Sequence, residues 1–166
     1  MGARSAGLLL YRLPGDGLVE VLIAHPGGPF WAKKDHGAWS VPKGEYEEGD
    51  DALAAAYREF VEETGFPAPV PAAQAVALGE LRQPSGKRVI VWAIEGDLDV
   101  TDATSNTFEM EWPRGSGRLQ EFPEIDRVEW VSLERARLKL LKGQVPFLDA
   151  LEASLSARGV AVRSDR

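Results

Sequence analysis

One helical pattern with strand-like apolar runs on both sides of it limits the possible folds more than any other feature of this sequence. Within Asp51–Thr64, a stripe recurs at spacings of four, three and four, formed by Leu53, Tyr57, Phe60 and Thr64 with Val61 beside it. This spacing places the stripe on one face of a helix that packs on a core. The chain therefore needs a layer against which a central helix can pack.

The ends of this helix also carry recognisable signals. Asp50 or Gly49 is expected to cap its start, because short polar residues and glycine are preferred there. Gly65 stands where a left-handed residue commonly ends a helix, and Pro67 prevents continuation.

Apolar and β-branched runs predict the other elements. The predicted strands are Ser5–Leu13, Val19–His25, Ala38–Val41, Ala75–Gln83, Arg88–Glu95, Phe108–Trp112 and Arg127–Val131. Two more helices are predicted, Leu133–Leu141 and Pro146 to about Ala157, and the rest of Asp97–Gly117 is expected to be a long loop. Strands on both sides of a central helix predict a mixed α/β fold with helices packed on a sheet. We expect a single domain over residues 1–157 and a disordered tail over 158–166.

Composition excludes several classes of protein. The chain has no cysteine, which rules out disulfides and cysteine-based zinc sites. No signal peptide is recognisable, and no apolar run approaches the roughly 20 residues that cross a bilayer. We therefore expect a cytoplasmic protein without a membrane partner.

The negative charge is concentrated in one segment. Between Glu45 and Glu63 lie eight acidic residues and one basic residue, Arg58, so this segment carries −7, which equals the net charge of the whole chain. An acidic protein is poorly suited to binding a nucleic-acid polymer. A local concentration of carboxylates instead indicates a place for cations.

Three of these acids share one face of the helix. Glu59, Glu62 and Glu63 stand at i, i+3 and i+4, and we expect this face to lie opposite the apolar stripe. A solvated face is the common interpretation of such a pattern. Solvated faces usually alternate in sign, however, and no lysine or arginine follows any of these acids by four residues. Repulsion at this spacing costs only about 0.2–0.5 kcal/mol per pair, so it does not itself identify a site.

The sequence around these acids has a specific form. It contains Gly44, five residues, Asp50, seven residues, Arg58-Glu59-Phe60, one residue, Glu62-Glu63, one residue, and Gly65-Phe66. This pattern closely resembles the Nudix box of the Nudix (MutT-like) hydrolases over 23 residues. The family normally has glutamate where Asp50 stands, and this difference puts the role of Asp50 in doubt more than the activity.

The resemblance implies a Nudix-type α/β/α sandwich with a mixed β-sheet. It also implies hydrolysis of a nucleoside diphosphate linked to another group, with Mg²⁺ or Mn²⁺ as cofactor. Hard Mg²⁺ prefers oxygen ligands and shares itself with substrate phosphates. By match to the box, Glu59, Glu62 and Glu63 would bind metal, and Glu62 or Glu63 would take a proton from water. The Gly44 carbonyl is a possible further ligand.

Further site residues are expected around the box. Arg58 would orient a box glutamate by a salt bridge, as it does in the family. Family members often supply another carboxylate before the later Glu-Trp strand, for which Glu124 is the first choice and Glu121 the second.

The substrate needs cationic and aromatic side chains. Candidate phosphate-binding residues are Lys43, Lys33, Lys34, Arg82, Lys87 and Arg88, and Trp31, Phe30 and Trp112 could stack on a base. The alternative interpretation is that the basic residues are solvated and that the aromatic residues anchor their loops to the core. His25 and His36 are too isolated in sequence to indicate a metal site.

The expected partner is a small nucleotide, and several substrates stay open. Ser5–Arg12 and Trp39–Glu45 look like the branch that cleaves dinucleoside polyphosphates such as diadenosine tetraphosphate. The alternatives are a house-cleaning NTP pyrophosphohydrolase and a Nudix-fold module that binds a nucleotide without hydrolysing it. A calcium-binding module is a weaker alternative because the chain lacks the alternating acidic loop of that class. The oligomeric state is not predicted.

Overall fold

The computed structural model describes residues 3–15, 17–160 and 162. The strands in these ranges are β1 (Arg4–Arg12), β2 (Glu20–Pro26), β3 (Lys43–Tyr46), β4 (Val76–Arg82), β5 (Arg88–Glu95), β6 (Thr107–Glu111), β7 (Leu119–Pro123) and β8 (Ile125–Ser132). The α-helices are α1 (Ala52–Thr64), α2 (Leu133–Lys139) and α3 (Pro146–Ala157). Short 3-10 helices cover Ala72–Gln74 and Lys142–Gln144.

A mixed sheet forms the centre of the molecule. Its order is β4-β5-β1-β2-β8, with β3 also paired to β1. β1 and β5 run parallel, and the other pairs are antiparallel. Along β1, Leu8 and Leu10 pack on one side of the sheet and Leu9 and Tyr11 on the other. Burial on both faces explains why β1 is a continuous apolar run rather than an alternating one.

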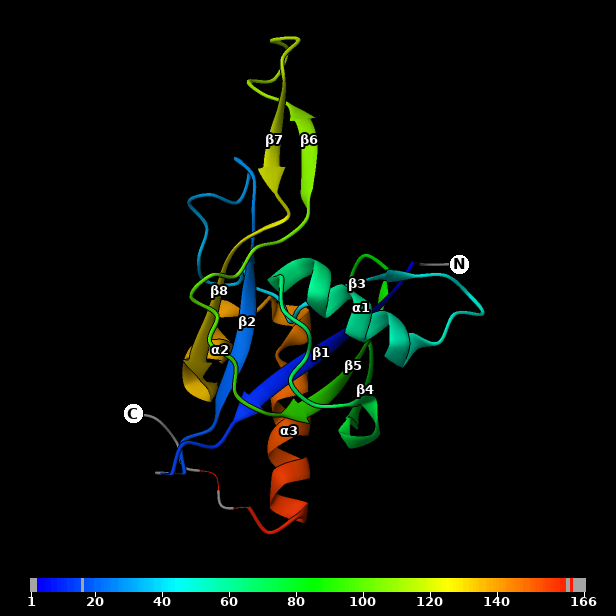
Figure 1. The fold of residues 1–166 in the computed structure, drawn as a ribbon, viewed down its shortest axis with the longest axis vertical. Coiled ribbons are helices and arrows are strands. Elements are labelled where there is room, and N and C mark those ends of the chain that lie inside the picture. Colours follow the sequence, from blue (N-terminus) through cyan, green and yellow to red (C-terminus); the bar gives the residue numbers. More distant parts are fainter. Residues whose placement is uncertain (1–2, 16, 161, 163–166) are drawn as a thin grey trace.

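Helices cover both faces of this sheet (Figure 1). α1 packs through Ala56 and Phe60 against the face that carries Leu8 and Leu10. α2 and α3 cover the opposite face, where Phe147 joins the second core cluster. The predicted α/β/α sandwich with a mixed β-sheet is therefore confirmed.

The strand predicted at Ala38–Val41 is wrong. Trp39 and Ser40 make only isolated bridges, to Leu140 and Ala24 respectively. The strand in this part of the chain is instead β3, for which no strand was predicted. Pro42 has no N–H and precedes it, and Lys43–Tyr46 then pairs antiparallel with the first residues of β1.

The long loop predicted over Asp97–Gly117 is also partly wrong. β6 pairs with β7 to form a separate two-stranded hairpin, which projects from the sandwich (Figure 1). The short strand predicted at Phe108–Trp112 corresponds to β6, shifted by one residue, and β7 was not predicted. β7 has the sequence Leu-Gln-Glu-Phe-Pro and is mostly exposed, so it lacks the apolar alternation of a half-buried strand.

Helix α1 begins and ends close to the predicted residues, but its cap differs. Asp51 occupies the N-cap position, and no side chain makes a capping hydrogen bond. The Asp50 carboxylate instead accepts a hydrogen bond from Glu47 N at 3.2 Å, so Asp50 closes the preceding turn. Gly65 is left-handed with φ of 81°, as predicted.

The glutamate face of α1 was expected to lie opposite the apolar stripe, but Glu63 lies beside the buried face. Ala55, Ala56, Phe60 and Thr64 are the buried residues of α1, whereas Val61 is 44% exposed. Three residues turn a helix through about 300°, so Glu63 lies only about 60° from Phe60. Glu63 therefore lies beside the core, and Glu59 and Glu63 are partly covered by β3.

The C-terminal segment is described only in part. Arg158 donates a hydrogen bond to the Tyr11 hydroxyl at 3.0 Å, and Val160 N donates to Leu155 O at 2.9 Å. Residues 161 and 163–166 of the expected disordered tail lie outside the described residues, and the tail and the domain limits stay predictions. Among the described residues, no helix is long and apolar enough to cross a membrane.

Candidate active site

Strand β3 brings Gly44 directly against the first glutamate of α1. Gly44 pairs with Ala6 of β1, and a Cβ placed on Gly44 would lie 2.0 Å from the Glu59 Cδ. The Glu59 side chain is only 14% exposed, and Arg58 Nη2 lies 3.5 Å from its Oε1. Only glycine allows the strand and this carboxylate to be so close together. The contact between Arg58 and Glu59 is compatible with the orienting role expected for Arg58.

Glu63 is tied to the same strand. Its Oε1 accepts a hydrogen bond from Lys43 N at 3.1 Å. Burial raises the pKa of Glu63 to about 8, against the opposing effect of this hydrogen bond and of the Lys43 charge. Burial likewise lowers the pKa of the Lys43 ammonium, which the charges of Glu63, Glu45 and Glu59 partly offset. Lys43 is thus the candidate phosphate-binding cation that lies within the cluster.

The first two box glutamates also interact with each other. Burial raises the pKa of Glu59, and a hydrogen bond and charge repulsion from Glu62 raise it further. Two neighbouring carboxylates repel each other unless a proton or a cation lies between them. This part of the site has an excess of negative charge that a bound cation would relieve.

Glu124 is connected to α1 through the main chain. Asn106 N donates to Glu62 O at 2.9 Å, and Glu124 N donates to Asn106 O at 2.8 Å. The Glu124 charge is one of the causes that raise the pKa of Glu63. Glu121, the second choice, lies instead in β7 on the projecting hairpin and pairs with Glu109. The geometry favours Glu124 over Glu121.

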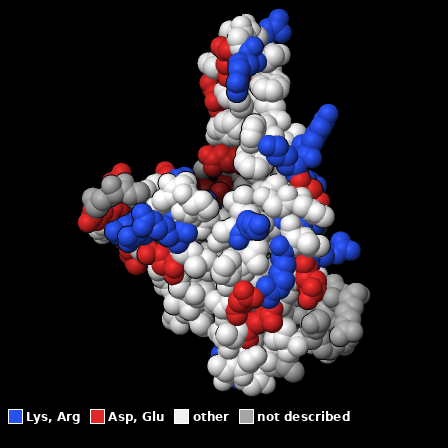
Figure 2. Space-filling model, turned by 180° about the vertical axis from the view of Figure 1, so that it is seen from behind, with Lys and Arg blue, Asp and Glu red and all other residues white. Residues whose placement is uncertain are grey.

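An apolar pocket of about 430 Å³ adjoins Glu124. Its walls are Pro26, Gly27, Gly28, Pro29, Phe30 and Trp31 from the loop after β2, and Phe108 and Met110 from β6. Figure 2 shows acidic side chains gathered in a recess at the base of the projecting hairpin. The pocket is concave and mostly apolar with a carboxylate at its edge, which is typical of a ligand site.

Some of the other candidate substrate residues line this pocket and others do not. Trp31 and Phe30 line the pocket, whereas Trp112 stands 37% exposed at the far end of β6 and does not. Lys33 is exposed, and it is Lys34 whose Nζ lies 3.7 Å from the centre of the Phe30 ring. Phe108 and Met110 were not predicted as substrate-binding residues. Their alternation in an apolar run was visible in the sequence, but nothing there indicated which side of the hairpin faces the pocket.

The basic residues of the β4–β5 hairpin lie beside each other rather than in this pocket. Lys87 Nζ lies 3.5 Å from Glu45 Oε1, and Arg88 lies 3.9 Å from Glu80. Arg82 pairs with Arg88 across the hairpin. Lys87 is close enough to Lys43 to lower its pKa, so of these three it lies nearest the cluster.

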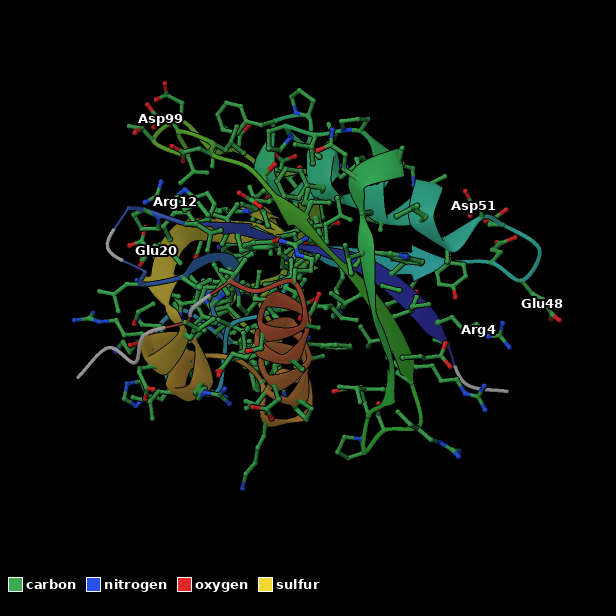
Figure 3. All side chains as sticks on the ribbon, turned by 90° about the horizontal axis from the view of Figure 1, so that it is seen from below. Arg4, Arg12, Glu20, Glu48, Asp51 and Asp99 are labelled. Atoms are coloured by element: carbon green, nitrogen blue, oxygen red, sulfur yellow. The ribbon has the colours of Figure 1, made fainter. Side chains whose placement is uncertain are left out.

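A larger hollow of about 580 Å³ lies elsewhere, around Arg12 and Trp130. Figure 3 shows Arg12, Glu20 and Asp99 at one end of the molecule and Glu48 and Asp51 at the other. The Arg12 guanidinium is engaged by Glu20 at 2.7 Å and Asp97 at 2.8 Å. This hollow is larger than the pocket beside Glu124, but it is lined neither by a box carboxylate nor by Glu124.

The residues of the cluster fit a divalent cation. Within the part of the chain that the structure describes, no three acidic or imidazole side chains converge into a ready-made metal site. Mg²⁺ does not require one, because it commonly binds one or two carboxylates and completes its shell with water and substrate phosphates. Glu59, Glu62 and Glu63 supply such oxygens, and the raised pKa of Glu59 and of Glu63 shows that Arg58 and Lys43 only partly compensate their burial.

The pKa of Glu63 predicts how stability changes with pH when divalent cations are removed. The folded pKa of about 8 lies above the usual 4.5, so the contribution of Glu63 is full below pH 4.5 and is lost as pH rises through 8. In EDTA, we expect the free energy of unfolding to fall between these values, by at most about 1.4 kcal/mol per pH unit.

Urea unfolding from pH 5 to 8.5 measures this slope. Glu63→Gln should flatten it, whereas Glu48→Gln, in the exposed loop before α1, should leave it unchanged. An equal slope in wild type and Glu63→Gln would contradict the assignment.

Fold and site together define the class of this protein. A mixed sheet lies between helices, and a carboxylate-bearing helix is held against an adjoining strand, so the protein is an α/β/α sandwich with a candidate cation site. Residues 3–151 match the sequence profile of the NUDIX domain. The chain therefore belongs to the Nudix hydrolase family, whose members cleave nucleoside diphosphate derivatives and generally depend on divalent metals.

Solved structures support the same fold. A Caenorhabditis elegans Ap4A hydrolase binary complex is 23% identical with a TM-score of 0.59, covering 93% of this chain and 98% of the other. The NUDIX domain of Shewanella oneidensis NrtR, complexed with ADP ribose, is 13% identical with a TM-score of 0.64 and coverages of 93% and 89%. The Escherichia coli ORF135 protein is 26% identical, with a TM-score of 0.54 and coverages of 94% and 92%. No curated protein matches this chain significantly in sequence.

Proposed function

We propose that this Nudix hydrolase uses Mg²⁺, with Mn²⁺ as a substitute, to cleave a phosphoanhydride bond in a nucleoside diphosphate-X substrate. The favoured substrate is a dinucleoside polyphosphate such as diadenosine tetraphosphate. The observation that carries this proposal is the junction at Glu124, where an apolar pocket of about 430 Å³ meets the carboxylate cluster. A base stacked in the pocket would present its phosphates to Lys43 and the glutamates.

Each residue has a defined task in this proposal. Glu59, Glu62 and Glu63 hold the metal, with Glu124 and the Gly44 carbonyl as additional oxygen donors. When bound, Mg²⁺ neutralises phosphate charge and orients water for displacement. Arg58 keeps the Glu59 carboxylate in place, and Glu62 or Glu63 accepts the proton of the attacking water.

Substrate binding depends on a second group of residues. Lys43 pairs with the phosphates from within the cluster, and Trp31 stacks on the base. Lys33 contacts the outer part of the substrate from the surface of the same loop. The binding partner is a small nucleotide, and the proposal includes a cytoplasmic location without a nucleic-acid polymer or a membrane as partner.

The choice among nucleotides depends on sequence. Ser5–Arg12 and Trp39–Glu45 look like the dinucleoside polyphosphate branch. The C. elegans enzyme adds support for the fold alone, because 23% identity does not determine a substrate. Fold by itself does not specify function.

Product analysis with a substrate panel tests the proposal. The panel contains diadenosine polyphosphates, canonical and oxidised NTPs, ADP-ribose and nucleotide sugars, each with Mg²⁺. ATP plus AMP from diadenosine tetraphosphate is the expected result. NMP plus pyrophosphate from an NTP would transfer the assignment to an NTP pyrophosphohydrolase. Nucleotide binding without turnover of any compound would replace hydrolysis with a binding function.

Glu124→Gln should lower kcat by roughly 10- to 100-fold, which is the usual effect of removing an outer metal-site carboxylate. The reason is that Glu124 lies within electrostatic reach of Glu63 and at the edge of the pocket. Steady-state kinetics on the best substrate measures this fall in kcat, with Glu121→Gln as the matched control on the projecting hairpin. Full kcat in Glu124→Gln would remove this residue from the mechanism.

A further inference from the structure

A histidine that the proposed mechanism does not use lies completely buried beside the pocket. His25 ends the apolar part of β2 and has 0% exposure. Its Nδ1 lies 2.7 Å from Asp126 Oδ1 of β8, and its Nε2 lies 2.5 Å from the main-chain oxygen of Lys34. The Trp39 ring packs edge-on against it at 5.1 Å between centroids. Both ring nitrogens therefore have fixed polar neighbours in an otherwise apolar setting.

These neighbours define the protonation state of the ring. A carboxylate and a main-chain carbonyl only accept hydrogen bonds, so both nitrogens of His25 must donate. A neutral imidazole carries one N–H and would leave one oxygen facing a lone pair inside the protein. The doubly protonated ring satisfies both oxygens, and the Asp126 carboxylate compensates its charge.

Arg127 and Lys139 are two further charged residues near the His25–Asp126 pair. On β8, Arg127 Nε lies 3.8 Å from Asp126 Oδ1, and its guanidinium lies 5.1 Å from the Trp39 ring centre. Lys139 of α2 lies on the same indole at 5.0 Å and is paired with Asp35 at 3.0 Å. Asp126 is thus the acidic group that contacts the His25 ring directly.

The hydrogen bond between His25 Nε2 and the Lys34 main-chain oxygen holds the loop that forms one wall of the pocket. Lys34 closes a turn by donating its N–H to Trp31 O at 2.9 Å, and its Nζ lies over the Phe30 ring. Phe30 and Trp31 are the two aromatic residues of the loop that line the pocket. In Figure 1 this loop, which follows β2, rises beside the base of the β6–β7 hairpin. Fixing the Lys34 carbonyl therefore fixes the turn that carries both rings.

The same region connects to Glu124. The pairing of β2 with β8 shifts register between His25 and Pro26, and Gly27 N then donates to Glu124 O at 2.9 Å. Such bulges often redirect side chains next to functional sites. The segment from His25 to Gly27 joins the aromatic wall of the pocket to the strand end that carries its carboxylate.

We propose that His25, held in its doubly protonated form by Asp126, is a positioning residue that fixes the aromatic wall of the base pocket through the Lys34 carbonyl. Its effect on nucleotide binding rests on the proposed function, whereas its protonation state does not. His25 touches no reacting atom, so it acts on substrate affinity through Phe30 and Trp31.

The first test observes the ring directly. The chain has two histidines, so His36→Gln leaves His25 as the one signal in protein labelled with ¹⁵N-histidine. Long-range proton–nitrogen spectra at pH 7 should show protons on both ring nitrogens, and Asp126→Asn should remove one of them. An unprotonated ring nitrogen in the His36→Gln protein would overturn the proposal, whether or not the protein hydrolyses nucleotides.

The second test separates positioning from folding. His25→Gln cannot bond both oxygens at once, so KM for the best nucleotide should rise about tenfold with kcat within about twofold, as for a loss of uniform binding. Asp126→Asn should change KM in the same direction, and His36→Gln should leave it unchanged. An unchanged KM in folded Asp126→Asn and His25→Gln would overturn the proposal.

Two outcomes of this second test have to be kept apart. If His25→Gln fails to fold, as judged by circular dichroism, Asp126→Asn decides alone. If the wild type turns over no nucleotide, the proposed function fails, and the nitrogen spectra still decide the protonation state.

Discussion

Glu62→Gln and Glu63→Gln will each lower kcat by about a hundredfold or more, the size of effect expected when a general base is lost. Glutamine keeps the shape of the side chain but neither accepts a proton from water nor neutralises a cation. Glu63 is fixed by the hydrogen bond from Lys43 N at 3.1 Å, so its substitution removes an oriented carboxylate rather than a mobile one. Glu62 lies close enough to Glu59 to raise the pKa of that carboxyl.

Kinetics with Mg²⁺ on the best substrate of the panel measures this loss. Glu134→Gln, in an exposed turn of α2, is the control for removing one negative charge. Circular dichroism and urea unfolding without metal separate catalysis from folding, since relief of burial and repulsion should leave both variants at least as stable as wild type. Full activity in both variants would eliminate them as base and as metal ligands.

Gly44→Ala will have the second largest effect, and it will reduce activity much more than stability. The new Cβ would lie 2.0 Å from Glu59 Cδ and 2.1 Å from its Oε2. These atoms are the far end of a flexible side chain, so the carboxylate can swing away while the strand stays paired with β1. The displacement exceeds 1 Å, and misplacement of that size can cost about a hundredfold in rate.

Gly15→Ala is the matched control, because a Cβ there meets nothing within 4 Å. We expect Gly44→Ala to show a kcat about a hundredfold below that of Gly15→Ala, with urea midpoints that differ little. Wild-type kcat in Gly44→Ala would show that the position of the Glu59 carboxylate is not important for catalysis. A collapse of stability would show that β3 itself cannot accept a side chain at Gly44.

The packing also explains why a cluster that looks repulsive in sequence persists in the fold. The spacing of Glu59, Glu62 and Glu63 suggested a face opposite the core, where water would screen their charges. In the structure Glu63 lies beside Phe60, and Glu59 and Glu63 lie against β3, where burial is the first cause of their raised pKa. Burying carboxylates there has a cost in stability, which Arg58 and the Lys43 N–H offset in part and a bound cation would offset further.

Asp50 illustrates how a departure from the family pattern is accommodated. The sequence suggested a helix cap, but its carboxylate accepts a hydrogen bond from Glu47 N in the loop before α1. Asp51 occupies the N-cap position instead. Asp50 therefore shapes the acidic loop, and its contacts do not place it among the carboxylates that flank β3.

By itself, the sequence determined the features that depend on residues close together in the chain. The period of α1, its end at Gly65 and the spacing of the box glutamates are local, because a helix relates residues three and four apart. The apolar run of β1 similarly predicted a strand, and the structure then showed that this strand is buried on both faces. Local pattern also predicted a mixed α/β fold, and the resemblance to the Nudix family implied the α/β/α sandwich.

Tertiary structure alone decided which distant segments meet. β7 is polar and exposed, and pairing with β6 rather than any apolar period makes it a strand. Gly44 is separated from Glu59 by fifteen positions, and only the pairing of β3 with β1 brings them into contact. The pocket wall depends on His25 reaching Asp126, 101 positions away, across two paired strands. These contacts depend on strand order and register, which the sequence of any one segment does not specify.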